Sequence, residues 1–253
     1  MVRVSPLVRP LSARSVVLSL LLGAHPPQLP VRELVRAAEV FDISEATLRV
    51  ALSRMLAAGD LRRAEGGYRL SARLVDRQIR QDDAIQPPTK AWRGAWELAV
   101  VTATGRGPAE RTQLRAQLAQ LRLAELREGV WLRPANLRRP WPASLDESVQ
   151  RLDARPDGVP EALVRALWDL DGWAAAARLL LARLETATRP AERIARAAGI
   201  VRQLLTDPVL PPELQPNGWP AQALRFAYAG YRAELVEFSG APGSPLRAAA
   251  RTR

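Results

Sequence analysis

Apolar residues recur at helical spacing in three successive segments near the start of the chain. Ser12 and Ser44 stand where they can cap the first and third of these helices, and the second helix follows Pro30. The stretch Leu61–Leu70 contains two short extended runs around a Gly-Gly pair, a pattern typical of a β-hairpin. Three helices followed by a glycine-turned hairpin predict a winged helix-turn-helix domain over residues 1–72.

A second pattern follows a connecting helix and a proline-containing linker at residues 73–90. Trp96–Thr102 is apolar enough for a buried strand, Pro108–Leu121 has helical periodicity, and another strand is expected around Val130–Arg133. This β-α-β order predicts a small α+β domain over residues 91–143.

The rest of the chain has mainly helical patterns, which predict a helical domain over residues 144–240. It is interrupted by Thr206–Pro220, which has five prolines and no expected regular element. The basic segment 241–253 has the composition of a disordered tail. The fold class is therefore expected to be α+β and mostly helical.

The formal net charge is +11, from 37 basic and 26 acidic residues. An arginine-rich chain is also typical of a G+C-rich genome, so the distribution of charge is more informative than its total. Residues 1–83 carry 13 basic and 9 acidic residues and residues 84–143 carry 10 and 4, whereas residues 144–240 carry 11 and 13. This asymmetry favours an N-terminal part, residues 1–143, that binds a polyanion and a C-terminal part with a different role.

The composition argues against several functional classes. There is no cysteine, and the single histidine, His25, cannot form a zinc centre by itself. The apolar run Val16–Leu22 follows N-terminal arginines as in a signal peptide, but it is too short to span a bilayer and fits the first helix. We therefore expect a cytoplasmic protein that has no cofactor and does not associate with a membrane.

The third expected helix is capped by Ser44 and runs to about Ala58, and its stretch Ser44–Leu56 has two distinct faces. Its apolar stripe is formed by Leu48, Ala51, Leu52 and Met55. The opposite face carries Ala46, Arg49, Val50, Ser53 and Arg54. An ordinary amphipathic helix with a solvated charged face is one interpretation. The helix is third in the expected winged helix and is followed by Arg62, Arg63 and Arg69 of the hairpin, which favours double-stranded DNA as the partner.

Several segments resemble the PaaX family, bacterial repressors of phenylacetate catabolism. "SARSVVLSLLLG" and "FDISEATLRVALSRMLAAGDLRR" resemble its opening helix and its recognition helix and wing, and "WRGAWELAVV" and "REGVWLRP" resemble its central domain. "LWDLDGW" and "LLTDPVLPPELQPNGWP" resemble its C-terminal domain. The resemblance implies a ferredoxin-like central domain used in dimerisation and a helical C-terminal domain. It also implies a homodimeric repressor, released from its operator by an aryl-acyl-CoA effector.

The effector site is expected in the C-terminal half, with Trp168, Arg202, Asp207 and Trp219 as candidate residues. The chain departs from the family where a tyrosine is replaced by Ala177 and a histidine is replaced within Ala197-Ala198-Gly199. These differences predict that the effector is not necessarily phenylacetyl-CoA.

Other interpretations of single features also stay open. Asp169 and Asp171 form a candidate carboxylate pair, but their position favours the start of a helix, and no catalytic residues are predicted. Packing is the expected role of four tryptophans that could instead stack on bases, namely Trp92, Trp96, Trp131 and Trp141.

Two further functions compete with an effector-controlled repressor. A metal-dependent nuclease is one, because the ferredoxin-like fold also occurs in CRISPR-associated nucleases, but Glu97 is the only acidic residue of the candidate strand. An architectural DNA-binding protein without an effector is the other. The sequence favours a regulator that is not an enzyme.

Overall fold

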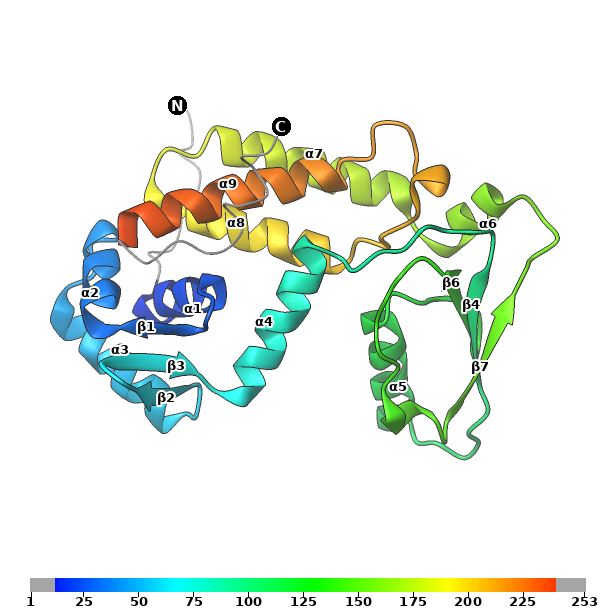
Figure 1. Ribbon diagram of the computed structural model, residues 1–253, viewed down its shortest axis with the longest axis horizontal. Helices are drawn as coiled ribbons and strands as arrows, with labels where there is room; N and C mark the ends of the chain where they lie inside the picture. Colours follow the sequence, from blue (N-terminus) through cyan, green and yellow to red (C-terminus); the bar gives the residue numbers. More distant parts are fainter. Residues whose placement is uncertain (1–11, 240–253) are drawn as a thin grey trace, which may run out of the picture. The chain divides into compact units, whose positions relative to one another are not determined.

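The computed structural model describes residues 12–239, with the side chains of residues 12–235. The fold is α+β and mostly helical, as expected. Within the described residues, the chain divides into a first compact unit, residues 12–85, 178–202 and 222–239, and a second, residues 86–177 and 203–221 (Figure 1). The tail at residues 241–253 lies outside the described residues.

This division corrects the expectation of one separate helical domain at residues 144–240. The helical segments 178–202 and 222–239 cluster with the winged helix, whereas residues 144–177 and 203–221 cluster with the central sheet. The sequence patterns located the helices correctly, but they carry no information about which partner each apolar face packs against.

The first unit contains the predicted winged helix (Figure 1). Its helices are α1 (Ala13–Gly23), α2 (Val31–Val40) and α3 (Glu45–Ala57), and its hairpin consists of β2 (Leu61–Ala64) and β3 (Gly67–Leu70). The apolar stripe of α3 is buried as predicted, with Leu48, Leu52 and Met55 each 1% exposed. These side chains join residues of α1 and α2 in one apolar core.

Local chemistry sets the ends of these helices. The hydroxyl oxygen of Ser12 accepts a hydrogen bond from the backbone N–H of Ser15 at 3.2 Å, and that of Ser44 accepts one from Thr47 at 3.3 Å. Both serines thus act as the predicted N-caps. Gly59 follows α3 with φ of +69°, a conformation that ends a helix easily only at glycine.

A strand that the sequence did not predict completes the wing. The HPPQLP segment, expected only to break the first helix, contains β1 (Gln28–Pro30), which pairs antiparallel with β3 and gives the sheet order β1-β3-β2. Gly67 permits this pairing, because a Cβ atom there would lie 2.0 Å from the backbone oxygen of Leu29. The strand escaped prediction because it has three residues, two of them proline or glutamine.

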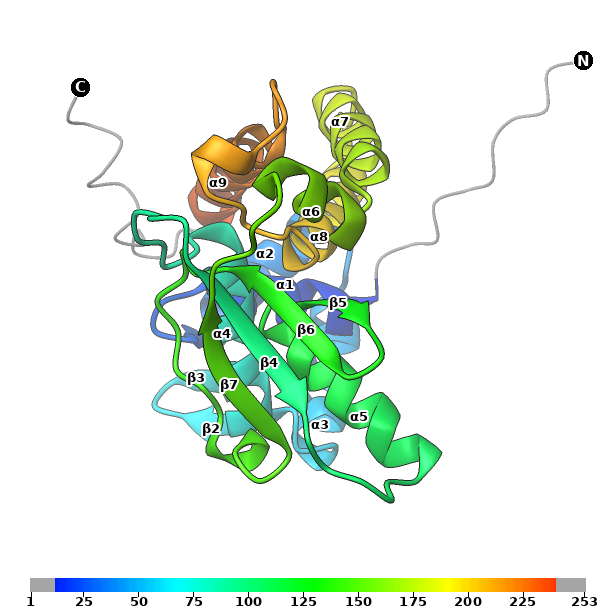
Figure 2. The same cartoon turned by 90° about the vertical axis from the view of Figure 1, so that its right-hand side faces the viewer.

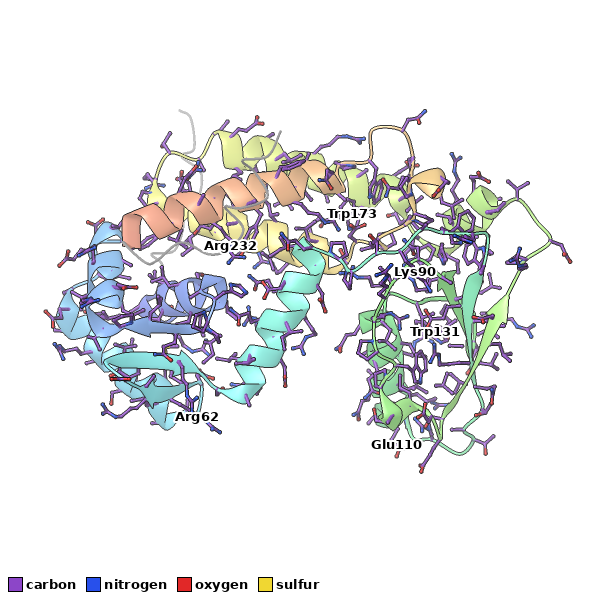
Figure 3. The ribbon with its side chains drawn as sticks, viewed as in Figure 1. Arg62, Lys90, Glu110, Trp131, Trp173 and Arg232 are labelled. Atoms are coloured by element: carbon purple, nitrogen blue, oxygen red, sulfur yellow. The ribbon has the colours of Figure 1, made fainter. Side chains whose placement is uncertain are left out.

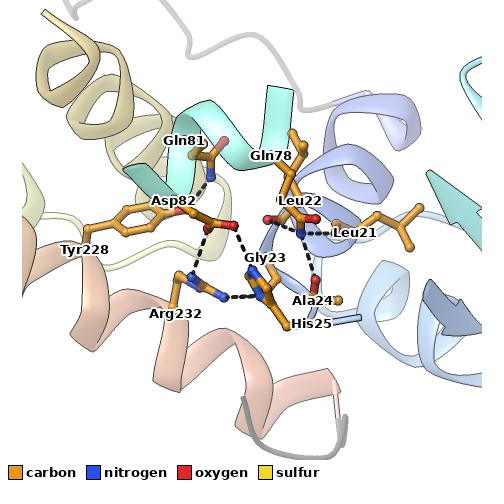
Figure 4. A network of polar contacts seen from close by, with 10 residues as sticks. All are labelled: Leu21, Leu22, Gly23, Ala24, His25, Gln78, Gln81, Asp82, Tyr228 and Arg232. Atoms are coloured by element: carbon orange, nitrogen blue, oxygen red, sulfur yellow. Dashed lines mark hydrogen bonds and ion pairs between the residues drawn. The ribbon is translucent and has the colours of Figure 1, made fainter. Parts of the chain in front are cut away.

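Four helices accompany the winged helix in the first unit, wholly or in part: α4 (Ala72–Ile85), α7 (Leu170–Glu185), α8 (Pro190–Leu205) and α9 (Ala221–Ser239). The Nε2 group of Gln78 on α4 donates to the backbone oxygens of Leu22 at 3.0 Å and Ala24 at 2.8 Å (Figure 4). These carbonyls at the end of α1 have no partner within the helix, so a buried glutamine satisfies them. The connecting helix is thereby fixed to the winged helix.

A polar cluster joins α9 to the same region (Figure 4). Arg232 donates to Nδ1 of His25 across 3.2 Å, and Nε2 of His25 lies 2.8 Å from a carboxylate oxygen of Asp82. Arginine is only a donor, so Nδ1 must accept and the imidazole proton resides on Nε2, where it is donated to Asp82. Next to this cluster, the side-chain amide of Gln81 donates to the hydroxyl of Tyr228 at 2.8 Å.

The second unit is built on a four-stranded antiparallel sheet with one long helix, α5 (Pro108–Gln120). Its strands are β4 (Trp96–Val101), β5 (Ala124–Arg127), β6 (Val130–Pro134) and β7 (Val149–Ala154). The sheet order is β5-β6-β4-β7 (Figure 2), so the first strand lies between the third and the fourth, as in ferredoxin-like domains. A short 3-10 helix, η1 (Ala143–Leu145), stands between β6 and β7, where that fold usually has a second α-helix.

The sheet also corrects two sequence expectations. β5 and β7 were not predicted, and β7 lies beyond residue 143, where the central domain was expected to end. β7 pairs with the whole length of β4, so residues up to Ala154 belong to this sheet. Its polar pattern, with only Val149 fully buried, is that of an exposed edge strand, which does not resemble the apolar runs used to find strands.

The two faces of the sheet have different coverings. Ala99 and Trp131 face α5 and pack against Leu114 and Leu118. The opposite face, at the Trp96 end, packs against α6 (Pro160–Leu167), the start of α7 (Leu170–Glu185) and the proline-rich segment, which contains a 3-10 helix, η2 (Pro212–Leu214). The predicted packing role of the tryptophans is visible in Trp96, which is 1% exposed, and Trp131, which is 6% exposed.

A buried arginine connects the sheet to the proline-rich segment. Arg133 on β6 is 0% exposed, and its guanidinium donates to the side-chain oxygen of Asn136 at 2.8 Å and to the backbone oxygens of Pro134 at 3.0 Å, Arg122 at 3.3 Å and Val209 at 3.3 Å. Burial, together with the charge of Arg139, lowers the pKa of Arg133 to about 9, so the group remains charged at neutral pH. The residue therefore fulfils the hydrogen-bonding needs of three chain segments at once.

We expect Arg133→Gln to destabilise the second unit, because a shorter neutral side chain leaves several buried carbonyl oxygens without a donor. The free energy of unfolding should fall by about 2–4 kcal/mol. All seven tryptophans belong to the second unit, so tryptophan fluorescence during urea denaturation follows this unit selectively. The matched control is Arg127→Gln at an exposed position on β5, which should change the free energy by less than about 0.5 kcal/mol. Equal effects of the two substitutions would contradict the role of Arg133.

Candidate nucleic-acid interface

The exposed face of α3 is the first part of the candidate interface. All five residues predicted for DNA contact on this helix are exposed, namely Ala46, Arg49, Val50, Ser53 and Arg54. Val50 is 50% exposed, so its side chain is accessible to a partner. Small residues beside long arginines leave room for close approach to a groove, and a valine can contact the methyl group of thymine.

The two arginines of α3 differ in their present partners. The Nε group of Arg49 donates to a carboxylate oxygen of Glu45 at 2.8 Å, one helical turn earlier, and both side chains are exposed. Such a surface pair contributes only about 0.3–0.5 kcal/mol, so a phosphate or a guanine edge can replace it. Arg54 forms no ion pair with any described residue. Arg54 is therefore the more directly available of the two.

The wing presents its arginines in an arrangement that favours an external anion. Arg62 and Arg69 are directly opposite each other on the antiparallel strands β2 and β3, on one face of the hairpin, and both are exposed. Like charges in that position are destabilising, and no described carboxylate pairs with either. Arg62 projects outward from the hairpin (Figure 3). Arg63 is opposite Tyr68 and is also exposed.

Asp60 holds the wing against the helices. Its side chain is 3% exposed and forms ion pairs with Arg14 of α1, at 2.8 Å, and with Arg73 of α4. Its backbone oxygen accepts from Ser71 at 2.9 Å, which closes the base of the hairpin. Arg14 and Arg73 are thus structural, although the sequence alone does not distinguish them from the arginines of the exposed face.

Sequence reasoning missed two further arginines. Arg32 and Arg36 on α2 are exposed, are four residues apart and thus share a face, and form no ion pair with a described residue. In a helix-turn-helix, the helix before the recognition helix crosses the DNA backbone. Their i, i+4 spacing was the signal that could have found them.

The candidate effector residues are dispersed. Trp168, Asp207 and Trp219 belong to the second unit, whereas Arg202 belongs to the first. Asp207 is 1% exposed, and its carboxylate accepts from the backbone N–H of Val209 at 3.0 Å. Asp207 therefore has a structural role in the proline-rich segment.

The two candidate tryptophans are partly available. Trp219 stacks on Trp173 with ring centroids 4.6 Å apart, and Trp168 follows the end of α6. Both Trp168 and Trp219 are half-buried against the apolar cluster that covers the sheet. Arg202 is exposed in the last turn of α8 and forms no ion pair with a described residue.

The family-departing positions are closely packed. Ala177 is 0% exposed and Ala197 is 2% exposed. A Cβ atom at Gly199 would approach a methyl group of Leu180 to 3.0 Å. Larger side chains at these positions would require neighbours to move, so the replacements by small residues are part of the packing of this chain.

The competing catalytic features have structural roles. A carboxylate oxygen of Asp169 accepts from the backbone N–H of Gly172 at 2.9 Å, at the start of α7. Glu97 lies 2.8 Å from the guanidinium of Arg139 and 3.8 Å from that of Arg151. Among the described residues, no group of three or more histidine or acidic side chains is placed to hold a metal ion.

Comparisons with known proteins agree with this organisation. The family of PaaX-like proteins matches residues 12–74, and that of the PaaX protein central Cas2-like domain matches residues 89–154. The chain belongs to the PaaX family. The second match ends at the last residue of β7, which agrees with the extent of the sheet.

One solved structure is similar to this PaaX-family protein over nearly the whole length of both chains. It is described as the uncharacterized protein Rv0674 from Mycobacterium tuberculosis. Its sequence is 46% identical, the TM-score is 0.81, and the alignment covers 91% of this chain and 98% of that chain. No curated protein matches the chain.

PaaX-family proteins are transcriptional regulators, and membership of the family indicates DNA as the partner. The described helices include none that is both long and apolar enough to cross a membrane. The recognition of the family and its fold class is therefore confirmed, while the roles of individual residues stay predictions.

We expect Arg54→Ala to weaken binding to the specific operator by about 1–3 kcal/mol, because it removes a contact to a base edge. Arg49→Ala should act in the same direction. In contrast, Arg62→Ala and Arg69→Ala should weaken binding to every DNA sequence and each reduce the slope of log affinity against log salt by about 1, because they remove phosphate contacts. Titrations of specific and unrelated duplexes at several salt concentrations distinguish the two classes.

The control for these variants is Arg127→Ala, which removes an exposed arginine from the sheet of the second unit. It should leave both the affinity and the salt slope unchanged. Unchanged operator affinity in both the Arg49 and the Arg54 variants would remove α3 from the reading of bases.

Proposed function

We propose that this protein is a homodimeric transcriptional repressor that binds an operator through α3 and the wing and is released by an acyl-CoA effector. The observation that carries the DNA-binding part is the set of exposed arginines without carboxylate partners, formed by Arg54 on α3 and Arg62, Arg63 and Arg69 on the wing. Family membership supports transcriptional regulation as the setting.

In this proposal, α3 lies in the major groove with Ala46, Val50 and Ser53 against the base edges. Arg49 and Arg54 contact guanine or the flanking phosphates, and Arg49 gives up its pair with Glu45 on binding. The wing arginines contact the adjacent backbone. In this proposal, the protein represses transcription because it occupies a promoter that contains its high-affinity operator.

Dimerisation is proposed because one recognition helix reads only a few base pairs, too few to select a single site in a genome. The sheet face opposite α5 offers a surface for it. Leu98, Val100 and Val130 are only half-buried there, and Leu152 on the edge strand β7 is 48% exposed. The strand register places Leu98 beside Leu152 and Val100 beside Val130, so the four form one apolar strip.

Effector control is proposed for the helices after residue 154. The half-buried rings of Trp168 and Trp219, both in the second unit, are available to an aromatic acyl group. An effector that lowers operator affinity a hundredfold must prefer the released state by about 2.7 kcal/mol.

The dimer should sediment at roughly twice the chain mass of 27.8 kDa at micromolar concentration. Leu152→Glu should shift it toward the monomer, because the substitution introduces charge into the apolar strip. Leu126→Glu on the opposite edge strand is the matched control, since Leu126 is also 48% exposed, and should leave the dimer intact. A wild-type protein that stays monomeric both free and on DNA would overturn this part of the proposal.

The effector is tested with a fluorescently labelled operator duplex and a panel of aryl- and alkyl-CoA thioesters. We expect at least one thioester to lower the anisotropy of the bound duplex and to change tryptophan fluorescence, because all seven tryptophans lie in the second unit. If no thioester does either, the protein is an effector-independent architectural DNA-binding protein. DNA binding itself is measured in the same titration, so the two parts fail separately.

A further inference from the structure

A hollow of about 700 Å³ lies within the second unit, at the Trp96 end of the sheet. Its lining includes four cations, Lys90, Arg93, Arg138 and Arg155, and one acid, Asp153. Four alanines make up much of the remaining wall. Figure 3 marks Lys90, the only lysine of the chain, just before β4.

The backbone fixes two of these cations on adjacent segments. The backbone N–H of Lys90 donates to Asn136 at 2.8 Å, and that of Arg138 donates to Pro88 at 2.7 Å. An isolated antiparallel bridge between Thr89 and Leu137 lies between these two bonds. The linker and the segment after β6 therefore form a short extra ladder that holds Lys90 and Arg138 at the rim.

The charges around the hollow lack internal partners. All four cations and Asp153 are exposed. None of the four cations forms an ion pair with a described carboxylate, including that of Asp153. Four positive charges and one negative charge leave a local excess of three. Like charges gathered around a concavity raise the local concentration of anions.

We propose that this hollow binds the polyphosphate group of a nucleotide-type small molecule. Its volume lies within the roughly 300–1,000 Å³ of small-molecule sites, whereas a single inorganic phosphate would fill little of it. Three guanidinium forks and one ammonium suit two or more phosphates, because arginine binds phosphate in a bidentate manner and lysine supplies a point charge. Alanine walls let a ligand approach the backbone closely. Nucleoside triphosphates and CoA esters share this chemistry.

The concave shape favours a small ligand over duplex DNA. The arginines of α3 and the wing stand on protruding elements, which suits a groove and a backbone, whereas these four cations surround a depression. The site is assigned independently of the DNA-binding role of the winged helix. It would coincide with the proposed effector site only if a CoA ester proves to be the ligand.

The test is calorimetric titration of the full chain with tripolyphosphate, ATP and CoA in turn. We expect saturable binding of at least one probe, and a change in tryptophan fluorescence because Trp92 adjoins the lining residues. Arg138→Gln and Arg155→Gln should each weaken that binding by about tenfold, since each removes a charged hydrogen-bond donor. Asp153→Asn should strengthen it, because the only acid of the lining is neutralised.

Arg127→Gln is the control for the loss of one exposed positive charge in the same unit. The proposal is overturned if none of the three probes binds, or if Arg127→Gln weakens binding as much as Arg138→Gln. It is also overturned if the pocket variants reduce duplex affinity while leaving all three probes unaffected, which would make the hollow a DNA contact. Urea denaturation of each variant verifies that the unit is folded. Comparing the binding of tripolyphosphate, ATP and CoA shows which class of phosphate compound the hollow prefers.

Discussion

The second unit depends on the buried guanidinium of Arg133. A buried charge is tolerated in a protein when it is well hydrogen-bonded, and here the guanidinium donates four hydrogen bonds, to oxygens of Asn136, Pro134, Arg122 and Val209. These oxygens come from the sheet and from the proline-rich segment, which cannot form a regular ladder of its own. Arg133 and Asn136 both donate to the carbonyl oxygen of Val209, and this contact ties the proline-rich segment to the sheet.

In the first unit, buried or partly buried acids perform the corresponding task. Asp60 fixes the wing to α1 and α4, and Asp82 accepts a hydrogen bond from Nε2 of His25 beside Arg232 of α9. Each acid engages arginines, so the arginines of this chain fall into two groups. Those paired with a buried or partly buried acid define the shape of the unit, and those that are exposed with no partner, or with only an exposed one as in Arg49, remain available to a polyanion. Lysine is nearly absent, so the same residue type serves both purposes.

Local patterns determined what the sequence could predict. The caps at Ser12 and Ser44, the buried stripe of α3 and the exposed arginines all follow from residues within one or two helical turns. The strands β1, β5 and β7 were missed because they are short or polar and are stabilised by pairing with distant segments. The role of Arg133 was missed for the same reason, since one of its acceptors is 76 residues away. The roles of Asp60 and Asp207 likewise depend on contacts that no periodicity encodes.

The arginines without partners also constrain the function. Arg62 opposite Arg69, and four cations around one hollow, each add repulsion to the folded state, which a different choice of exposed residue would avoid. Only a bound anion turns this repulsion into attraction. The two clusters differ in shape, because one is displayed on a hairpin and the other lines a concavity, so a single extended polyanion does not suit both equally. A chain with a protruding and a recessed cationic site is therefore suited to two anionic partners of different size, as a regulator that binds both DNA and a small molecule requires.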